Sequence, residues 1–386
     1  MHVLFIPKWY PGRNDPQLGD FLRKQAIAVA GHARVSVLHV AAMKELDQPR
    51  TQELVEQDGL WELHCYYRPS THTFAPLRKA LNALRYRKAF LQGWERLLRE
   101  RGLPELLHVH ILLRPALMAQ MVQRRYRIPY LVSEQSSGYL DGSFHARGAL
   151  YGRLAKRAMR GAAGITAVSA WLGDALVKHR LCEHYAVVPN VVPGLERPLP
   201  PRGTPGQLLV VADLVDKTKN VSGVLRALAR ARKLDARFEL TVVGDGPDRQ
   251  MLEDMVRSLG LADAVRFLGR LANNEVLDHT AKCWAVVINS NVETFSVVTG
   301  EALAQGKPVI ATRCGGPIAF VTPQNGLLID VGDDAALAAA MLELLAQNER
   351  YDPATIRQSV SERFSYDAVG RAFMEQYTKA LTHGRA

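Results

Sequence analysis

The sequence predicts two α/β domains, each built on a doubly wound parallel sheet. The chain has 386 residues, which suggests two domains rather than one. Short apolar runs alternate with helical patterns through both halves, as is typical of consecutive β-α-β units. A proline-rich run separates the two series and indicates a connection between domains; it contains Pro189, Pro193, Pro198, Pro200 and Pro201.

The first series of elements fills the first half of the chain. Short apolar runs predict its strands, and apolar residues at helical spacing predict the helices between them. We expect strands at residues 3–6, 35–40, 106–110, 130–133, 164–168 and 185–188, and helices at 21–30, 75–101, 115–125, 151–162 and 170–178.

The second series begins at Gln207 and shares this alternation without an obvious sequence repeat. We expect strands at residues 208–212, 238–243, 265–268, 285–288 and 308–312, and helices at 221–232, 249–259, 274–282, 298–305 and 334–346. An amphipathic helix then follows Phe364 and ends at Leu381. The expected divisions of the chain are 1–195, 196–364 and 365–386.

The cysteines and the apolar runs indicate a compartment and exclude some kinds of site. The four cysteines lie far apart and form no C-x-x-C pair, so we expect neither zinc nor a disulfide framework. No apolar run reaches the length of a membrane span, and the apolar start is too short for a signal peptide. We expect a cytoplasmic protein, either free or peripheral on the inner face of the plasma membrane.

The net charge of +11 is unevenly distributed. Between Arg68 and Arg101 there are nine basic residues against two acidic ones, and apolar residues such as Leu84, Trp94 and Leu97 lie among them at helical spacing. Such a helix can lie on an anionic membrane surface, or it can pack its apolar face in the core and leave a solvated basic face. Nucleic acid is not an expected partner, because no nucleic-acid motif accompanies the charge.

The most informative motif is N-V-E-T-F-S-V-V-T-G-E-A-L-A-Q-G-K-P-V-I-A-T-R-C-G-G, which begins at Asn291. It contains Glu293 on a loop after an expected strand and Glu301 on the helix behind that loop. Ligands bind at this edge of open α/β sheets, and amides at a helix N-terminus suit a phosphate. The amides concerned are those of Thr294, Phe295, Ser296 and Val297. By spacing alone, two glutamates could equally belong to a solvated helix.

In this context the chain resembles the retaining glycosyltransferases of family 4, and in particular members that build bacterial surface polysaccharides. The resemblance covers nearly the whole chain, and its signature is E-x7-E followed by G-K-P-V-I-A-T-x-C-G-G. It implies the GT-B fold, in which two Rossmann-like domains face each other across a cleft. The first domain would bind the acceptor, the second would bind the nucleotide sugar, and the C-terminal helix would cross back to the first.

The resemblance also implies an activity. We expect transfer of a hexose from a nucleotide diphosphate sugar to a saccharide or lipid-linked saccharide, with retention at the anomeric carbon. Glu301 would hold the ribose, Glu293 would face the donor sugar, and Lys219 with the Gly19 amide would hold the diphosphate. The leaving diphosphate would take up the acceptor proton, so no protein nucleophile, metal or cofactor is expected.

Further positions match family positions with weaker motifs, and each has an ordinary structural alternative. His110 would lie near the donor sugar or be a structural strand-end histidine. Glu134 would act on the acceptor or cap the next turn, and Trp9 and Tyr10 would line the acceptor cleft. On the donor side, the weaker matches are Gly244 in V-G-D-G-P and Arg270.

The sequence departs from the family pattern at two places. Asp213 stands where the family usually has a phosphate-binding arginine, and Lys217 is close enough in sequence to compensate. Ile318 and Ala319 stand where many members carry a glutamate. These departures keep open a non-catalytic homologue that binds a sugar or a partner. A phosphorylase or an epimerase on the same fold is a further alternative.

Overall fold

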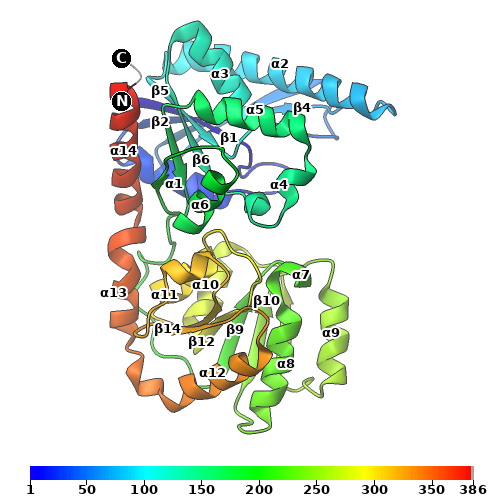
Figure 1. Ribbon diagram of the computed structural model, residues 1–386, viewed down its shortest axis with the longest axis vertical. Helices are drawn as coiled ribbons and strands as arrows, with labels where there is room; N and C mark the ends of the chain where they lie inside the picture. Colours follow the sequence, from blue (N-terminus) through cyan, green and yellow to red (C-terminus); the bar gives the residue numbers. More distant parts are fainter. Residues whose placement is uncertain (384–386) are drawn as a thin grey trace. The chain divides into compact units, whose positions relative to one another are not determined.

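The computed structural model describes residues 1–383 and divides into two compact units (Figure 1). The first comprises Met1–Val191 together with the segment that begins at Tyr366. The second is Val192–Ser365. Both are α/β units built on a sheet, which confirms the predicted fold class, and the divisions expected from the sequence lie next to these boundaries.

The first unit is built on a sheet in the order β3-β4-β2-β1-β5-β6-β7-β8. Its neighbouring strands are parallel except for β3 and β4, which pair antiparallel. The strands are β1 (His2–Pro7), β2 (Arg34–Ala42), β3 (Arg50–Gln57), β4 (Leu60–Tyr67), β5 (Leu106–His110), β6 (Tyr130–Glu134), β7 (Gly164–Ala167) and β8 (Ala186–Val187). The helices are α1 (Asp20–Ala30), α2 (Ala75–Arg101), α3 (Arg114–Tyr126), η1 (Ser137–Tyr139), α4 (Ser143–Ala146), α5 (Ala149–Arg160), α6 (Ala170–Lys178) and α14 (Tyr366–His383).

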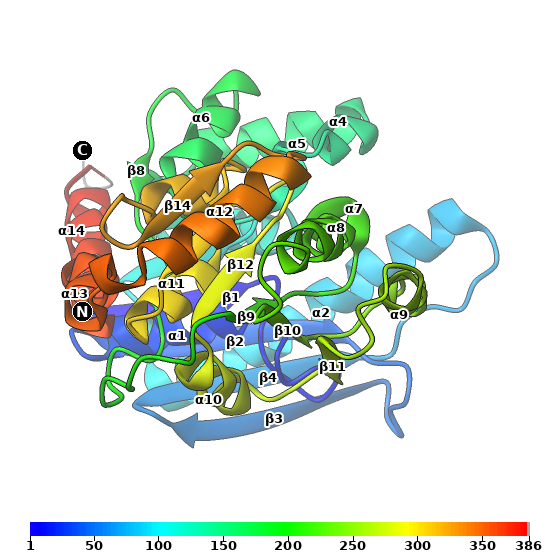
Figure 2. The same cartoon turned by 90° about the horizontal axis from the view of Figure 1, so that it is seen from below.

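The β3–β4 hairpin corrects the expectation of a wholly parallel sheet. Asp58 and Gly59 form its two-residue turn, with φ of 51° and 76°. An Asp-Gly turn between alternating residues is a strong hairpin signal, because both central positions need positive φ. The signal is present in the sequence and was missed there. β3 forms the outer edge of the sheet (Figure 2).

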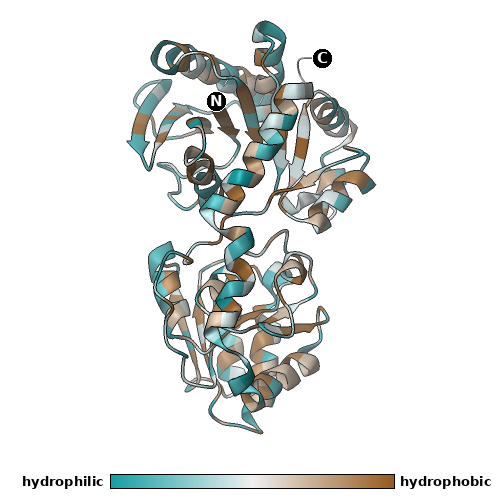
Figure 3. Cartoon of the chain, turned by 90° about the vertical axis from the view of Figure 1, so that its left-hand side faces the viewer, coloured by the Kyte–Doolittle hydropathy of each residue, from teal (hydrophilic) through white to brown (hydrophobic). Residues whose placement is uncertain are grey.

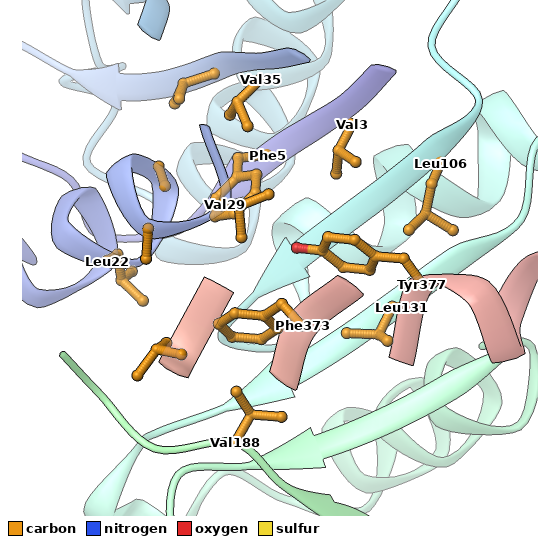
Figure 4. Close-up of a cluster of buried hydrophobic side chains, with 14 of the residues drawn as sticks. Val3, Phe5, Leu22, Val29, Val35, Leu106, Leu131, Val188, Phe373 and Tyr377 are labelled. Atoms are coloured by element: carbon orange, nitrogen blue, oxygen red, sulfur yellow. The ribbon is translucent and has the colours of Figure 1, made fainter. Parts of the chain in front are cut away.

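The C-terminal helix α14 completes the core of the first unit. It lies beside α1 (Figure 1), and hydrophilic and hydrophobic residues alternate along it (Figure 3). Phe373 and Tyr377 point from α14 into a cluster with Val3 and Phe5 of β1 (Figure 4), and all four side chains are fully buried. Burial of such side chains contributes about 1.5–3 kcal/mol each, so the first unit depends on residues from the far end of the chain.

The second unit is built on a wholly parallel sheet in the order β11-β10-β9-β12-β13-β14. Its strands are β9 (Gln207–Val211), β10 (Glu239–Val243), β11 (Val265–Gly269), β12 (Ala285–Ile288), β13 (Val309–Thr312) and β14 (Gly326–Ile329). Its helices are α7 (Asp216–Lys219), α8 (Val221–Arg232), α9 (Arg249–Ser258), α10 (Asn273–Lys282), α11 (Val297–Ala304), η2 (Gly316–Ala319), α12 (Asp334–Ala346), η3 (Asn348–Arg350) and α13 (Pro353–Phe364). The sequence reasoning missed β14, α7 and α13.

Each sheet reverses its winding direction once. In the first unit this switch point lies between β1 and β5, and in the second it lies between β9 and β12. The loops that leave neighbouring strands in opposite directions open a crevice at such a point, which is where open α/β sheets bind ligands. The two switch points are therefore the places to look for function.

Candidate functional site

An ion pair lies at the switch point of the second unit. Lys219 ends α7, which follows β9, and its Nζ lies 2.6 Å from Oε1 of Glu293, which follows β12. The same carboxylate oxygen accepts a 2.8 Å hydrogen bond from the hydroxyl of Ser290. Lys219 is 24% exposed and Glu293 is 15% exposed, so the pair is accessible from solvent without being freely solvated. The structure thus brings together two residues predicted to act on the donor.

Two asparagines fix the loop after β12 against α7. The Asn289 amide donates to the carbonyl of Asn220 at 3.0 Å, and the Asn291 amide donates to the carbonyl of Lys217 at 2.8 Å. The backbone N–H of Asn291 also donates to the carbonyl of Thr218 at 2.8 Å. These bonds hold the two loops in one register, so the ion pair is positioned by backbone contacts and not only by its own attraction.

The double glycine of the motif, Gly315 and Gly316, lies in a segment that holds the backbone of Glu293 from the other side. The Glu293 N–H donates to the Cys314 carbonyl at 3.0 Å, and the Gly316 N–H donates to the Glu293 carbonyl at 2.9 Å. A Cβ on Gly316 would lie 2.4 Å from the backbone carbonyl of Phe295, so no larger residue fits without moving the loop. The glycine in the motif is therefore needed for close approach of two backbone segments.

The N-terminus of α11 follows Glu293 directly. Its N-cap, Ser296, has φ of 70°, an uncommon conformation for a residue other than glycine. The Ser296 hydroxyl lies 2.7 Å from that of Thr299, which anchors the first turn. The Phe295 side chain packs on Phe320 and Phe364 in the core. At Phe295 only the backbone is therefore available for the predicted donor contact.

Glu301 lies on α11 and is only 3% exposed. Its Oε1 accepts a 3.1 Å hydrogen bond from the Asn273 amide at the start of α10. Desolvating a carboxylate is costly unless hydrogen bonds compensate for the loss of water, so a buried carboxylate at this position needs partners. Asn273 belongs to this site and was not found from the sequence.

The other predicted donor residues of this unit lie at the carboxyl ends of β9, β10 and β11. Gly244 has φ of 133°, and a Cβ there would overlap the Ala212 carbonyl oxygen, so this turn passes directly over the end of β9. Arg270 follows β11 and is exposed. Asp213 and Lys217 are both exposed after β9, and the backbone carbonyl of Lys217 accepts the hydrogen bond from the Asn291 amide.

A cavity of about 530 Å³ lies at the switch point of the first unit. Trp9 and Tyr10, the predicted acceptor residues, are both on its wall, and Tyr10 donates from its hydroxyl to buried Glu62 at 2.5 Å. The wall also includes residues that the sequence reasoning did not single out: Lys8, His39, Tyr66, Tyr67, Tyr86, Arg114, Arg147 and Tyr151. Those from β4 and α2 depend on the missed hairpin and on helix packing, which no local motif encodes.

Glu134 makes the contacts expected of a residue that fixes a turn. Its Oε1 accepts from the Leu112 N–H and from the Tyr139 hydroxyl, both at 2.8 Å, and its Oε2 accepts from the Gln135 N–H at 3.2 Å. The side chain is fully buried, and this burial raises the pKa of the carboxyl group although the hydrogen bonds oppose the shift. The geometry matches the capping alternative, and contact with an acceptor stays a prediction.

His110 lies in the core of the first unit, at the end of β5. Its ring is fully buried, stacked 4.5 Å from Phe5 and 3.8 Å from the ring of His108 between centroids. Within residues 1–383 neither ring nitrogen has a hydrogen-bond partner, and desolvation lowers its pKa to about 3. His108 donates or accepts at Tyr377 and Ser133, at 2.7 and 2.6 Å. The structural alternative fits this burial, and the catalytic role of His110 stays untested.

The backbone conformation at position 19 requires a glycine. Gly19 is the N-cap of α1 with φ of 71°, and a Cβ would lie 2.7 Å from the backbone carbon of Trp9. The amide contact predicted for it stays a prediction.

Within residues 1–383 no group of three histidine, cysteine or acidic residues is arranged to hold a metal ion. Over the same residues, no helix is both long and apolar enough to cross a bilayer.

Two family models match the chain in succession. Residues 24–191 match the Glycosyl transferase 4-like domain, and residues 195–358 match the Glycosyl transferases group 1 domain. The fold and the two switch-point sites agree with these matches. The chain belongs to the glycosyltransferases of the GT-B fold.

Known proteins add detail to this assignment. The lipopolysaccharide core biosynthesis glycosyltransferase LpsD of Rhizobium meliloti is 34% identical over 48% of this chain and 55% of LpsD. A glycogen synthase of Mycobacterium tuberculosis is 33% identical over 47% of this chain and 44% of its own length. The chain thus spans about half the length of these curated relatives. The structure of Anabaena HepE in complex with UDP matches with a TM-score of 0.73 and 18% identity, over 98% of this chain and 100% of HepE, which shows the fold alone.

Proposed function

We propose that this protein is a retaining hexosyltransferase of family 4 that uses a nucleotide diphosphate sugar. The observation that carries the proposal is the switch point of the second unit, where Lys219 and Glu293 meet beside the N-terminus of α11. A cation and helix-terminal amides favour a diphosphate. Buried Glu301 then offers a carboxylate oxygen to ribose hydroxyls, and LpsD supports a saccharide acceptor and a role in polysaccharide synthesis.

The proposed reaction needs no group outside the two substrates and this chain. The bond from the anomeric carbon to the diphosphate oxygen breaks, and its electron pair goes to the diphosphate. The acceptor oxygen bonds to the same carbon on the same face, and its proton passes to the diphosphate. Lys219 and the amides of residues 294–297 stabilise the charge that develops on the leaving group, which is the kind of interaction that lowers a barrier most. No metal or cofactor enters this proposal.

The proposal extends to an anionic membrane surface as a partner. The first turns of α2 are exposed on every side, and Phe74, Leu77 and Leu84 are 62%, 41% and 53% exposed among basic residues. Exposed apolar residues with interleaved cations favour the interface of an anionic bilayer. Sedimentation with phosphatidylglycerol vesicles tests this at low and high salt. Binding that salt weakens supports it, and no binding at low salt rejects it.

The first test of the activity is calorimetric titration of UDP, GDP and ADP into the wild type and into Glu301→Ala. We expect one nucleotide to bind and the variant to lose most of that affinity, because the ribose contact disappears. Glu349→Ala is the matched control, since Glu349 is 89% exposed on the same unit. If none of the three binds to the wild type, the chain is a non-catalytic homologue. Anomeric configuration of the product, read by NMR, then tests retention.

A further inference from the structure

We propose that the cavity of the first unit binds an anionic saccharide, with a phosphate or carboxylate group held by Lys8, Arg114 and Arg147. The proposal rests on the proposed function, because it names the class of acceptor. The cavity volume of about 530 Å³ is within the range of small-molecule sites, and it lies wholly within residues of the first unit.

The three cations reach the cavity from different elements. Lys8 follows β1, Arg114 begins α3, and Arg147 follows α4. Within residues 1–383 none of them forms an ion pair with a carboxylate, whereas other arginines of this unit do, among them Arg13 and Arg23. Three positive groups around one cavity, against the single wall carboxylate of Asp15, leave an excess of positive charge. Like charges held close together raise the energy of the empty site, and a bound anion removes that cost.

Aromatic rings, rather than carboxylates, hold each of these cations. The Lys8 Nζ lies 5.1 Å from the centre of the Trp9 ring. The guanidinium of Arg114 lies 5.9 Å from the Tyr86 ring, and that of Arg147 lies 5.0 Å from the Tyr151 ring. Cation–π contacts orient a cation without neutralising it. The charges therefore remain available to a ligand while their side chains stay in place.

The environment of Lys8 agrees with this arrangement. Burial lowers the pKa of its ammonium group, and the nearby guanidinium groups of Arg147 and Arg114 lower it further, against the attraction of Glu134. The Glu134 carboxylate already accepts three hydrogen bonds, from the Leu112 N–H, the Gln135 N–H and the Tyr139 hydroxyl. The repulsion comes from the two arginines, and an anion between the three groups would reverse it.

The N-terminus of α3 adds partial positive charge at the cavity wall. Leu113 is the N-cap of this helix, and its φ of 101° is strained for a leucine. Strain of this kind persists only where the surroundings impose it, and it clusters at binding sites. Leu113 and Pro115 line the cavity, so the positive end of the α3 dipole lies at its wall.

Trp9 and four tyrosines give the cavity its selectivity for a sugar. Tyr66 and Tyr67 of β4, Tyr86 of α2 and Tyr151 of α5 supply flat apolar surfaces and hydroxyl groups. Ligand sites combine such surfaces with a few charged groups that fix orientation. Inorganic phosphate would use the cations alone, whereas a sugar phosphate would use both.

The same ligand chemistry can come from two sources. A soluble sugar phosphate or uronate can enter the cavity from solution, and a lipid-linked saccharide can present its phosphate from a bilayer. Tyr86 on the cavity wall belongs to α2, whose N-cap Phe74 and first-turn residue Leu77 are both exposed. The experiment below separates the two sources.

The test measures binding of glucose 6-phosphate, glucuronate and glucose by ligand-observed NMR. We expect the two anions to bind at least about tenfold more tightly than glucose, and added salt to weaken them. The double variant Arg114→Gln/Arg147→Gln removes two positive charges from the rim and should abolish that preference. Arg124→Gln/Arg153→Gln is the matched control, because it makes the same charge change on α3 and α5 at residues that do not line this cavity.

A second arm uses phosphatidylcholine vesicles with and without polyprenyl-phosphate glucose. Retention of the wild type, but not of the double variant, on the loaded vesicles supports a lipid-linked source. Binding of free glucose 6-phosphate alone supports a soluble one. The proposal is overturned if anionic sugars bind no more tightly than glucose and loaded vesicles retain no more protein than plain ones, or if the double variant and its control behave alike.

Nucleotide titration of the same proteins separates this proposal from the proposed function. If a nucleotide binds and no anionic sugar does, the acceptor class is wrong and the donor site stands. If anionic sugars bind and no nucleotide does, the transferase proposal fails while the cavity assignment remains. The double variant should bind nucleotide as the wild type does, since neither substitution changes a residue that is expected to hold the donor.

Discussion

The two switch points have similar sheet geometry and opposite ways of arranging charge. In the second unit, Lys219 and Glu293 neutralise each other at 2.6 Å, and backbone hydrogen bonds lock the loops that carry them. In the first unit, Lys8, Arg114 and Arg147 lie against aromatic rings without carboxylate partners within the described residues. The difference indicates that one fold can present a rigid, charge-balanced site and an open, positively charged one, because loops and not strands supply the chemistry.

The two units also differ in their buried histidines. This difference predicts the largest effect, which is a loss of folding stability at acid pH. Desolvation lowers the pKa of His2 to about 4, and lowers those of His39 and His110 to about 3. All three lie in the first unit, whereas residues 192–365 contain His279 as their only histidine. Acid should therefore destabilise the first unit more than the second.

The sign of this effect follows from proton binding. The unfolded chain takes up protons near pH 6.5, while the buried rings stay neutral, so stability is complete above that pH and is lost as pH falls towards 4. Each ring contributes at most about 1.4 kcal/mol per pH unit. The raised pKa of Glu134 acts in the opposite direction, but it is a single group. Calorimetry between pH 7 and 5 measures the loss of folding stability, and peptide-resolved hydrogen exchange shows which of the two units loses it. Equal loss of protection in both units would contradict the prediction.

Removing the positive charge of Lys219 from its pair with Glu293 should have the next largest effect. Lys219→Ala should lower kcat by about 10²–10³, which corresponds to about 3–4 kcal/mol, because a fixed positive group no longer faces the leaving diphosphate. Steady-state kinetics with the nucleotide sugar identified by titration measures the loss. Lys233→Ala serves as the control, since Lys233 is an exposed residue at the end of α8. Turnover that survives Lys219→Ala would remove this residue from the proposed mechanism.

The rigidity of the second site can be tested at its double glycine. Gly316→Ala places a Cβ against the backbone of Phe295, so we expect about 1–3 kcal/mol of destabilisation and weaker nucleotide binding. Gly152→Ala is the comparison, because a Cβ on this residue of α5 meets nothing within 4 Å. There we expect a gain of about 0.5–1 kcal/mol, since alanine is the better helix residue. Chemical denaturation measures the free energy of unfolding of both variants. Equal changes would show that the close approach of Gly316 to Phe295 does not exclude a Cβ.

The smallest expected effect concerns the core beneath the first site. Tyr377→Phe removes the hydroxyl that lies 2.7 Å from the Nδ1 of His108, and we expect a loss of about 1–2 kcal/mol. Tyr351→Phe is the control in the second unit, because the Tyr351 hydroxyl is buried without a partner within residues 1–383. Its removal should be neutral or stabilising. Urea denaturation of both variants checks the prediction, and a loss at Tyr351 as large as that at Tyr377 would contradict it.

The donor side could be predicted further than the acceptor side, for a physical reason. Glu293 lies in the loop after β12, Lys219 ends the short helix α7 that follows β9, and β9 and β12 are neighbours, so the order of the strands brings the two residues to the same edge of the sheet. The cavity instead takes Tyr66 from the missed hairpin and Tyr86 from the long helix α2. Alternation of side chains along β5 puts His108 and His110 on one face of the sheet. It could not predict how deeply they are buried, because the helix that covers them comes from more than 250 residues later.

The return of α14 to the first unit has a consequence for synthesis of the protein on the ribosome. Phe5 and His108 are made before residues 192–365, yet Phe373 and Tyr377, which cover them, are made after those residues. Residues 192–365 form a continuous unit whose whole sequence is complete before that point. N-terminal domains usually fold first during translation, but here the first unit can complete its core only after residues 192–365 have been made. The early half of the nascent chain therefore leaves the apolar surface beneath Phe373 and Tyr377 uncovered while the whole second unit is made, and such transiently exposed surface is what chaperones protect.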